Sequence, residues 1–347
     1  MLAEIKVSRN DAGQKVERYL RKYFFAMSLD RLQSLFRRKE IKIDRKAIDR
    51  SYMLKENDLL QVYGLKENEI KSEVKSEVKW DQADTQSQSQ FSAEQTQKIS
   101  SQVRPFIIPI LHEDEDILVL DKPGNLAVHP GTGIQKGGSL IEKVWEYLWT
   151  EEKSEELFQP ALVHRLDKET SGVIVVAKSG ESLRRLTGTL RNGGFTKKYL
   201  ALVEGVLKPA KGEITGLIQR IDSREGGAKS TVSEDEGKWS ITRYQTLKVM
   251  GDFSLLSVII ETGRMHQIRA HLAHKGHPIV GDSRYGIFAN NRDYRKNFGL
   301  KRTFLHAGDL EIALARGEKL NFHAELSPDL KLVLEKVTKI TNEVMPQ

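Results

Sequence analysis

Residues 163–177 read VHRLDKETSGVIVVA, a polar, turn-forming loop followed directly by an apolar run. The run predicts a buried strand, because Val and Ile favour a pleated surface that is covered on both sides. Further strands are predicted at residues 117–120, 199–203 and 256–260, and a helix at 181–191. Strands come in clusters with helices between them and no regular βαβ repeat is present. Residues 105–347 are therefore predicted to form an α+β domain with a mixed, largely antiparallel sheet.

The loop before this strand carries the first candidate for chemistry. It holds Asp167 at the edge of a rigid scaffold, flanked by Arg165 and Lys168. Nearby positive charge favours an ionised carboxylate, which a nucleophile or a base requires. The alternative is a structural aspartate whose side chain caps backbone amides at positions 170 and 171 in a tight turn.

A second candidate string, ETGRMHQIRAH, spans residues 261–271 and follows a predicted strand. The segment from Gln267 to Lys275 is predicted to be helical, ending at Gly276. Arg264 and Arg269 could then face the loop of Asp167 and bind either phosphate or its carboxylate. Both could equally be ordinary surface arginines.

Four histidines in this region resemble metal ligands at first sight. They stand at spacings of five, three and three: His266, His271, His274 and His277. No zinc site of that spacing is known, and the chain has no cysteine to complete one. Residues 129–133, HPGTG, lack the Lys-Ser/Thr of a phosphate-binding loop, and no GxGxxG follows a strand. We therefore expect no metal and no nucleotide cofactor.

The whole-chain composition sets broader limits. With 347 residues, about two domains are expected. The absence of cysteine excludes disulfides, thiolate chemistry and iron–sulfur sites, and it fits a reducing cytoplasm. Apolar runs fall well short of the ~20 residues that span a bilayer, and the first residues lack the apolar stretch of a signal peptide. We expect a cytoplasmic monomer with no membrane partner.

Charge is concentrated at the N-terminus. Residues 1–65 carry a net +6 of the chain's +7 and are predicted to form two helices and a few strands. The second helix has a basic side made of Arg31, Arg37, Arg38 and Lys39. A small basic module before a near-neutral body suggests binding to a polyanion. A well-solvated surface is the alternative.

Residues 66–104 separate this module from the larger domain. They contain no Gly and no Pro, and only 9 of the 39 are hydrophobic. Such a segment buries too little apolar surface to offset the entropy of ordering it, so a polar, disordered linker is predicted. A short helix over residues 67–78 is the alternative.

Taken together, the strings resemble the RluA family of pseudouridine synthases. The resemblance rests on ordered motifs spread over residues 105–325: DKPG at 121–124, HPG at 129–131, HRLDKETSG at 164–172, KKYLALVEG at 197–205, GRMHQIR at 263–269, GHPIVGD at 276–282 and FLHA at 304–307. The first 65 residues resemble the small alpha-L RNA-binding domain that precedes the catalytic domain in many members. The chain is most similar to the RluC-like and RluD-like members, which modify large-subunit ribosomal RNA.

This resemblance implies an isomerase that converts uridine in RNA to pseudouridine without a cofactor. It assigns Asp167 as the catalytic aspartate, Tyr199 as the ring that stacks on the target base and Arg269 as the partner of the aspartate. Arg165 corresponds to a residue that contacts the extruded nucleotide. A transfer-RNA substrate and a non-catalytic RNA-binding or ribosome-assembly role remain the alternatives.

Two residues depart from the family pattern. Met265 stands where Thr or Ser is usual, which removes a hydroxyl near Arg269. Lys39 occupies a turn position where Gly is usual. A lysine there must either adopt a left-handed conformation or change the turn.

Overall fold

The structure is a computed structural model that describes residues 2–24, 27–65, 107–131, 133–148, 158–223, 227–314 and 317–344. These residues form two compact units, of which the first contains the N-terminal sheet and the second the large sheet. The predicted linker at residues 66–104 lies outside the described residues. The division at 65 and 105 stays a prediction.

The N-terminal unit is a four-stranded sheet with two helices. In chain order its elements are β1 (Ala3–Lys6), α1 (Val16–Tyr23), α2 (Leu29–Arg37), β2 (Ile41–Ile43), β3 (Lys46–Ala47) and β4 (Leu59–Val62), and the strand order is β1-β4-β2-β3. Ser28 begins α2 by accepting a hydrogen bond from the Arg31 amide, as a serine N-cap should. The apolar faces of both helices and the sheet enclose one core, which includes Leu20, Leu35 and Leu60.

Residue Lys39 ends this helical segment in the left-handed region, with φ of 58°. The turn that usually needs glycine is therefore kept, and the lysine adopts its conformation. Of the two outcomes that the sequence leaves open, the structure has the first.

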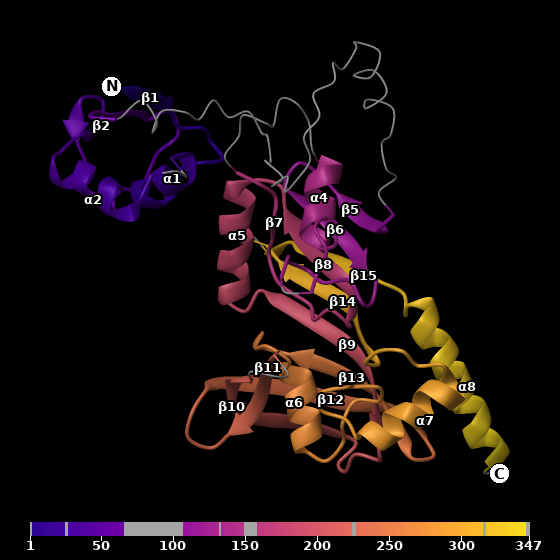
Figure 1. The fold of residues 1–347 in the computed structure, drawn as a ribbon. Coiled ribbons are helices and arrows are strands. Elements are labelled where there is room, and N and C mark those ends of the chain that lie inside the picture. Colours follow the sequence, from indigo (N-terminus) through magenta and orange to yellow (C-terminus); the bar gives the residue numbers. More distant parts are fainter. Residues whose placement is uncertain are drawn as a thin grey trace, which may run out of the picture. The chain divides into compact units, whose positions relative to one another are not determined.

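The second unit is built on an 11-stranded sheet (Figure 1). Its path runs β11-β10-β12-β13-β9-β14-β8-β6-β5, with β15 paired to β14 and β7 paired to β8. The strands are β5 (Ile110–Glu113), β6 (Ile117–Lys122), β7 (Ala161–Leu162), β8 (Ser171–Ala177), β9 (Phe195–Glu204), β10 (Lys211–Ser223), β11 (Gly227–Ser233), β12 (Lys238–Met250), β13 (Phe253–Ile260), β14 (Leu305–Ala313) and β15 (Lys319–His323). Only β14 and β8 pair in parallel among these neighbours. The predicted mixed, largely antiparallel α+β architecture is confirmed.

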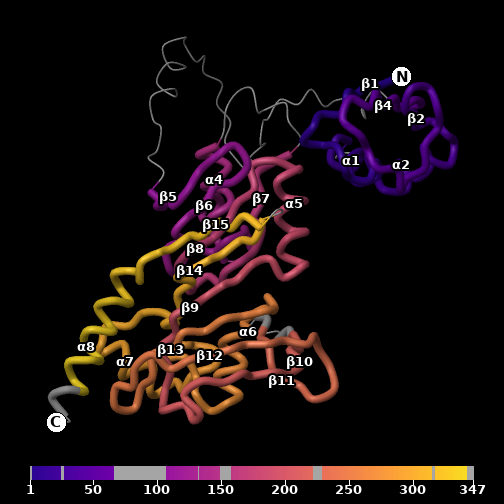
Figure 2. The backbone as a smooth tube through the Cα atoms, turned by 180° about the vertical axis from the view of Figure 1, so that it is seen from behind, coloured from indigo at the N-terminus to yellow at the C-terminus, as the bar shows by residue number. Residues whose placement is uncertain are grey.

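Helices lie between and after these strands in the chain. They are α4 (Leu140–Leu148), α5 (Gly180–Arg191), α6 (Gln267–His274), α7 (Phe288–Phe298) and α8 (Pro328–Val344). Leu186 of α5 packs on Val173, Val175 and neighbouring core residues of the strands. Helix α6 lies against β11 and β12, and α7 lies against α8 (Figures 1 and 2). None of the helices in the described ranges is both long and apolar enough to cross a membrane.

The central strand β9 joins the two halves of the sheet, because it lies between β14 and β13 (Figure 2). The loop before β8 and the loop after β13 therefore approach each other over β9. Strands β8 and β14 approach each other closely where they pair, which fixes this geometry. At that point Gly172 of β8 pairs with Ala307 of β14 and has φ of +113°. A Cβ at Gly172 would overlap the Ala307 carbonyl. Only glycine fits here without a shift of the backbone.

Candidate active site

The Asp167 loop is held at both of its ends. The Val163 amide donates to the Val175 carbonyl at 2.9 Å, and the Val175 amide donates back to His164 Nε2 at 3.2 Å. Further along, the Thr170 amide donates to the backbone carbonyl of Asp167 at 3.1 Å. This turn is therefore closed by backbone, and the Asp167 carboxylate points elsewhere. The capping alternative is not what the structure has.

Two buried basic side chains hold the carbonyls that follow Asp167. Lys122 Nζ donates to the Lys168 carbonyl at 3.2 Å and to the carbonyls of Pro123 and Leu126 at 2.9 Å. Arg302 donates to the Glu169 carbonyl at 2.7 Å. Burial and, to a smaller extent, the Arg302 charge lower the pKa of Lys122 to about 7, against the opposing effect of Asp167 and Asp121. The loop is thus attached to the protein interior on both sides of its tip.

Residues 261–266 connect β13 to α6 and are organised by the buried side chain of Gln267. Its Oε1 accepts from Thr262 Oγ1 at 2.8 Å and from the Arg264 amide at 3.1 Å. Its Nε2 donates to the Ile241 carbonyl at 2.9 Å. One amide therefore fastens both the loop and the first turn of α6 to β12.

Arg269, in the first turn of α6, contacts two carboxylates. Its Nη1 donates to Asp167 Oδ2 at 3.0 Å, while Nε and Nη2 donate to the two oxygens of Asp282 at 2.7 and 2.8 Å. Arg269 is 5% exposed and Asp282 is fully buried. Burial lowers the pKa of Arg269, but the two carboxylates more than offset this and keep it above its usual value. The guanidinium is therefore a permanent charge in a fixed orientation beside Asp167.

Tyr199 stands on β9 between Ala307 of β14 and Val258 of β13. The residue is 6% exposed. Burial, with a smaller contribution from the Asp167 charge, raises the pKa of its phenol above the usual value. The ring is thus a neutral, apolar surface that ends in a hydroxyl.

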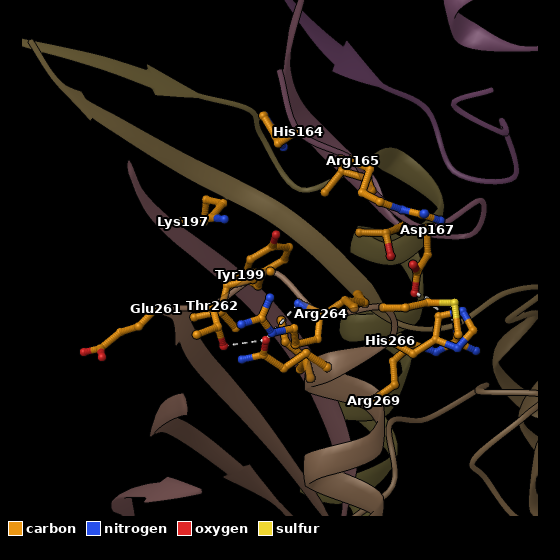
Figure 3. Close-up of a pocket in the computed structure, with 18 of the residues that line it drawn as sticks. His164, Arg165, Asp167, Lys197, Tyr199, Glu261, Thr262, Arg264, His266 and Arg269 are labelled. Atoms are coloured by element: carbon orange, nitrogen blue, oxygen red, sulfur yellow. Dashed lines mark hydrogen bonds and ion pairs between the residues drawn. The ribbon is translucent and has the colours of Figure 1, made fainter. Parts of the chain in front are cut away.

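These three residues line one pocket of about 480 Å³ (Figure 3). Arg165 and Arg264 line the same pocket, and both are exposed. The structure therefore brings together five of the nine residues predicted from the sequence. The other four, Arg31, Arg37, Arg38 and Lys39, belong to the N-terminal unit. Arg31 donates to the Gly64 carbonyl at 2.6 Å within that unit.

The end of the pocket away from Asp167 contains buried nitrogen groups (Figure 3). Lys197 lies two residues before Tyr199 on the same side of β9, and burial lowers its pKa. His164 lies near it, and burial followed by the Lys197 charge lowers the pKa of His164 to about 3. His164 is therefore neutral at physiological pH.

Three of the four candidate histidines have separate polar partners. His266 Nε2 lies 3.8 Å from Asp167 Oδ2, His271 Nδ1 lies 2.9 Å from Thr242 Oγ1, and His277 Nδ1 lies 2.8 Å from the Glu204 carbonyl. No group of three or more His, Cys, Asp or Glu side chains suited to a metal ion is found within the described ranges. The histidines are dispersed rather than gathered.

Several contributors to the site have no role in the sequence-based prediction. Asp282 orients Arg269, Lys122 holds the loop, and Tyr285 contacts both His266 and Arg269. Asp282 lies in the motif GHPIVGD and Lys122 in the motif DKPG, so motif membership is the signal that marks them in the sequence. Tyr285 lies outside every quoted motif, and nothing in its sequence context marks it.

Known proteins are similar to this chain. Residues 116–274 match the family described as RNA pseudouridylate synthase. Ribosomal large subunit pseudouridine synthase C of Escherichia coli is 32% identical over 336 residues, which cover 96% of each protein. The chain belongs to the RluA family of RNA pseudouridine synthases. It is an isomerase that acts on RNA.

Other relatives of this pseudouridine synthase agree. Ribosomal large subunit pseudouridine synthase C of Buchnera aphidicola is 31% identical, over 89% of this chain and 88% of that protein. The structure of human RNA Pseudouridylate Synthase Domain Containing 4 has a TM-score of 0.53 and 26% identity, and the match covers 66% of this chain and 92% of the human chain.

Proposed function

We propose that this pseudouridine synthase modifies uridines of large-subunit ribosomal RNA, with Asp167 as its catalytic carboxylate. The observation that carries the proposal is the contact between Asp167 and Arg269 at 3.0 Å inside the pocket. The match to a ribosomal large subunit enzyme over 96% of both chains supports the choice of substrate, because it includes the basic N-terminal unit.

The reaction explains why a carboxylate is needed. Isomerisation breaks the bond between N1 of uracil and C1′ of ribose, turns the base and joins its C5 to C1′. A buried base must first leave the RNA helix to reach such a pocket. The Asp167 carboxylate then either attacks the ribose or removes a proton from it, and the fixed guanidinium of Arg269 holds it in orientation.

Tyr199 supplies the surface for the detached base. Its ring lines the pocket that contains Asp167, and a flat aromatic face stacks on uracil. The raised pKa keeps the hydroxyl protonated, so it can donate a hydrogen bond to the base. It can take part in proton transfer from C5 only if another group accepts the hydroxyl proton.

Exposed arginines supply the RNA contacts. Arg165 and Arg264 stand at the pocket, where they can contact the extruded nucleotide and its phosphates. Arg31, Arg37, Arg38 and Lys39 of the N-terminal unit add phosphate contacts that increase affinity with little sequence information. Binding should accordingly weaken as salt concentration rises.

Mapping pseudouridines in total RNA from cells with and without this gene tests the proposal. We expect one or more sites in large-subunit ribosomal RNA to disappear and the transfer-RNA sites to persist. Loss of transfer-RNA sites alone would contradict the proposal that ribosomal RNA is the substrate. A strain that carries Asp167→Asn should match the deletion, whereas normal sites in that strain would point to the non-catalytic alternative.

A further inference from the structure

A chain of polar groups leads from β11 to the Asp167 carboxylate through Tyr285 and His266. The Ser230 amide donates to Tyr285 Oη at 2.8 Å, and Tyr285 Oη lies 3.1 Å from His266 Nδ1. His266 Nε2 in turn lies 3.8 Å from Asp167 Oδ2 (Figure 3). Tyr285 and His266, in the middle of this chain, therefore each have a polar neighbour on both sides.

The chain selects one tautomer of His266. Because the Ser230 amide already donates to Tyr285 Oη, the hydroxyl proton of Tyr285 is available to His266 Nδ1. A neutral imidazole that accepts at Nδ1 carries its proton on Nε2. That nitrogen faces Asp167, where a bare lone pair would repel the carboxylate. Both neighbours thus favour the same proton position.

The charge state of His266 agrees with a neutral ring. Burial lowers its pKa, and so do Arg269 and Arg284, whereas Asp167 and Asp282 act in the opposite direction. The net direction is downward, so the imidazole is neutral at physiological pH.

The backbone and the packing also hold the ring in place. His266 has φ of 53°, a left-handed conformation that is uncommon for a residue other than glycine. The Tyr285 ring meets the His266 ring edge-on, with centroids 5.7 Å apart. Lys229 and Arg269 lie over the Tyr285 ring at 4.8 and 5.2 Å. The surrounding structure therefore fixes both rings.

We propose that His266 is a positioning residue that directs its Nε2–H at the catalytic carboxylate of Asp167, and that the Tyr285 hydroxyl sets this tautomer. The inference rests on the proposed role of Asp167. At 3.8 Å the contact is longer than a hydrogen bond, so it restrains the free carboxylate only loosely. It tightens when a uridine fills the pocket, as catalytic hydrogen bonds commonly do.

Two substitutions of His266 separate donation from packing. In His266→Gln the amide nitrogen takes the place of Nε2, so a donor still faces Asp167. In His266→Asn the amide reaches only the place of Nδ1, and asparagine tolerates the left-handed backbone well. With ribosomal RNA from cells lacking the gene as substrate, we expect His266→Asn to fold normally but to lose roughly 10- to 100-fold in kcat at unchanged KM. His266→Gln should stay within about threefold of wild type.

A role in packing alone predicts the reverse order, with the Asn variant active and the Gln variant impaired. That order would overturn the proposal. Because glutamine is strained at this φ, kcat is compared per folded molecule, with the folded fraction taken from circular dichroism.

Tyr285→Phe tests the tautomer. The substitution removes the hydroxyl and should lower kcat in the wild-type background. It should not lower kcat further in His266→Gln, because a glutamine amide has no tautomers that the Tyr285 hydroxyl could select. An equal loss in both backgrounds would overturn the proposal. Nitrogen-15 shifts of His266 provide a readout without turnover, and we expect protonated Nε2 in wild type and a mixture in Tyr285→Phe. Protonated Nδ1 in wild type would contradict the proposal even if Asp167 proves to be catalytic.

Discussion

One guanidinium nitrogen of Arg269 donates to the Asp167 carboxylate at 3.0 Å, although the two residues lie 102 positions apart in the sequence. The pair is possible because the loop before β8 and the first turn of α6 meet over β9. The guanidinium does not depend on Asp167 for its orientation, since Asp282 accepts its other two hydrogen bonds. Asp167 therefore meets a cation that is already fixed.

Replacing Asp282 should damage both stability and activity. Asp282→Asn leaves Arg269 buried with only one carboxylate, and breaking a buried charge pair typically costs about 3–5 kcal/mol. Asp282 also accepts from the Arg284 and Tyr285 amides, so the following turn loosens too. Denaturant unfolding measures the loss. The matched control is Asp309→Asn, whose exposed ion pairs should change the unfolding free energy by less than about 1 kcal/mol. Equal effects of the two variants would refute this account of Arg269.

A single methyl group added at Gly172, where β8 pairs with β14, should disrupt the site. Gly172→Ala combines a positive φ with overlap against the Ala307 carbonyl, so we expect a loss of more than about 3 kcal/mol and a displaced Asp167 loop. Gly188→Ala, inside α5 with no atom near the new methyl group, should instead be neutral or stabilising by up to about 1 kcal/mol. Thermal unfolding of both variants decides the matter, and a stable Gly172→Ala would show that the two strands approach less closely than described.

The buried amine of Lys122 predicts a pH dependence of stability. Its pKa of about 7 lies below the ~10.4 of an unfolded lysine, so between these values the unfolded chain binds a proton that the folded chain has lost. Stability from this group consequently rises with pH in that window and is lowest below pH 7. Relative to Lys122→Met, the unfolding free energy of wild type should increase by up to about 1.4 kcal/mol per pH unit between pH 7 and 10.

The control for that series is Lys331→Met on the exposed side of α8. Its difference from wild type should not vary with pH. A constant difference for Lys122→Met as well would mean that burial does not discharge the amine, because the three carbonyls that it contacts hold the ammonium form.

Two variants of Tyr199 separate stacking from hydroxyl chemistry. Tyr199→Phe keeps the ring and should retain RNA affinity while turnover falls by about 10²-fold, the scale of a lost proton-transfer group. Tyr199→Ala removes the stacking surface and should weaken RNA binding too. Binding is measured by filter retention and turnover by pseudouridine formation. Normal turnover of Tyr199→Phe would restrict this residue to stacking.

The sequence predicts well those features that are local. The apolar run after Asp167, the helix that contains Arg269 and the alternation around Tyr199 each follow from periodicity within a few residues. Partnerships at a distance are different. Nothing near Asp282 shows that it faces Arg269, and Lys122 is a charged residue that composition alone would place at the surface. Its burial depends on three carbonyls from two loops, which only the folded chain brings together. The role of Tyr285 cannot be predicted from the sequence for the same reason, because only folding brings it to His266 and Arg269.

Tritium release from RNA labelled at C5 of uridine tests the central claim most directly, because joining C5 to ribose expels that hydrogen. The purified protein should release tritium from large-subunit ribosomal RNA that lacks the modification. Asp167→Asn, which keeps an oxygen acceptor for Arg269 while Asp282 still accepts two hydrogen bonds from it, should remain folded and release no tritium above the blank. Release by Asp167→Asn at the wild-type rate would contradict the assignment of Asp167 as the catalytic carboxylate.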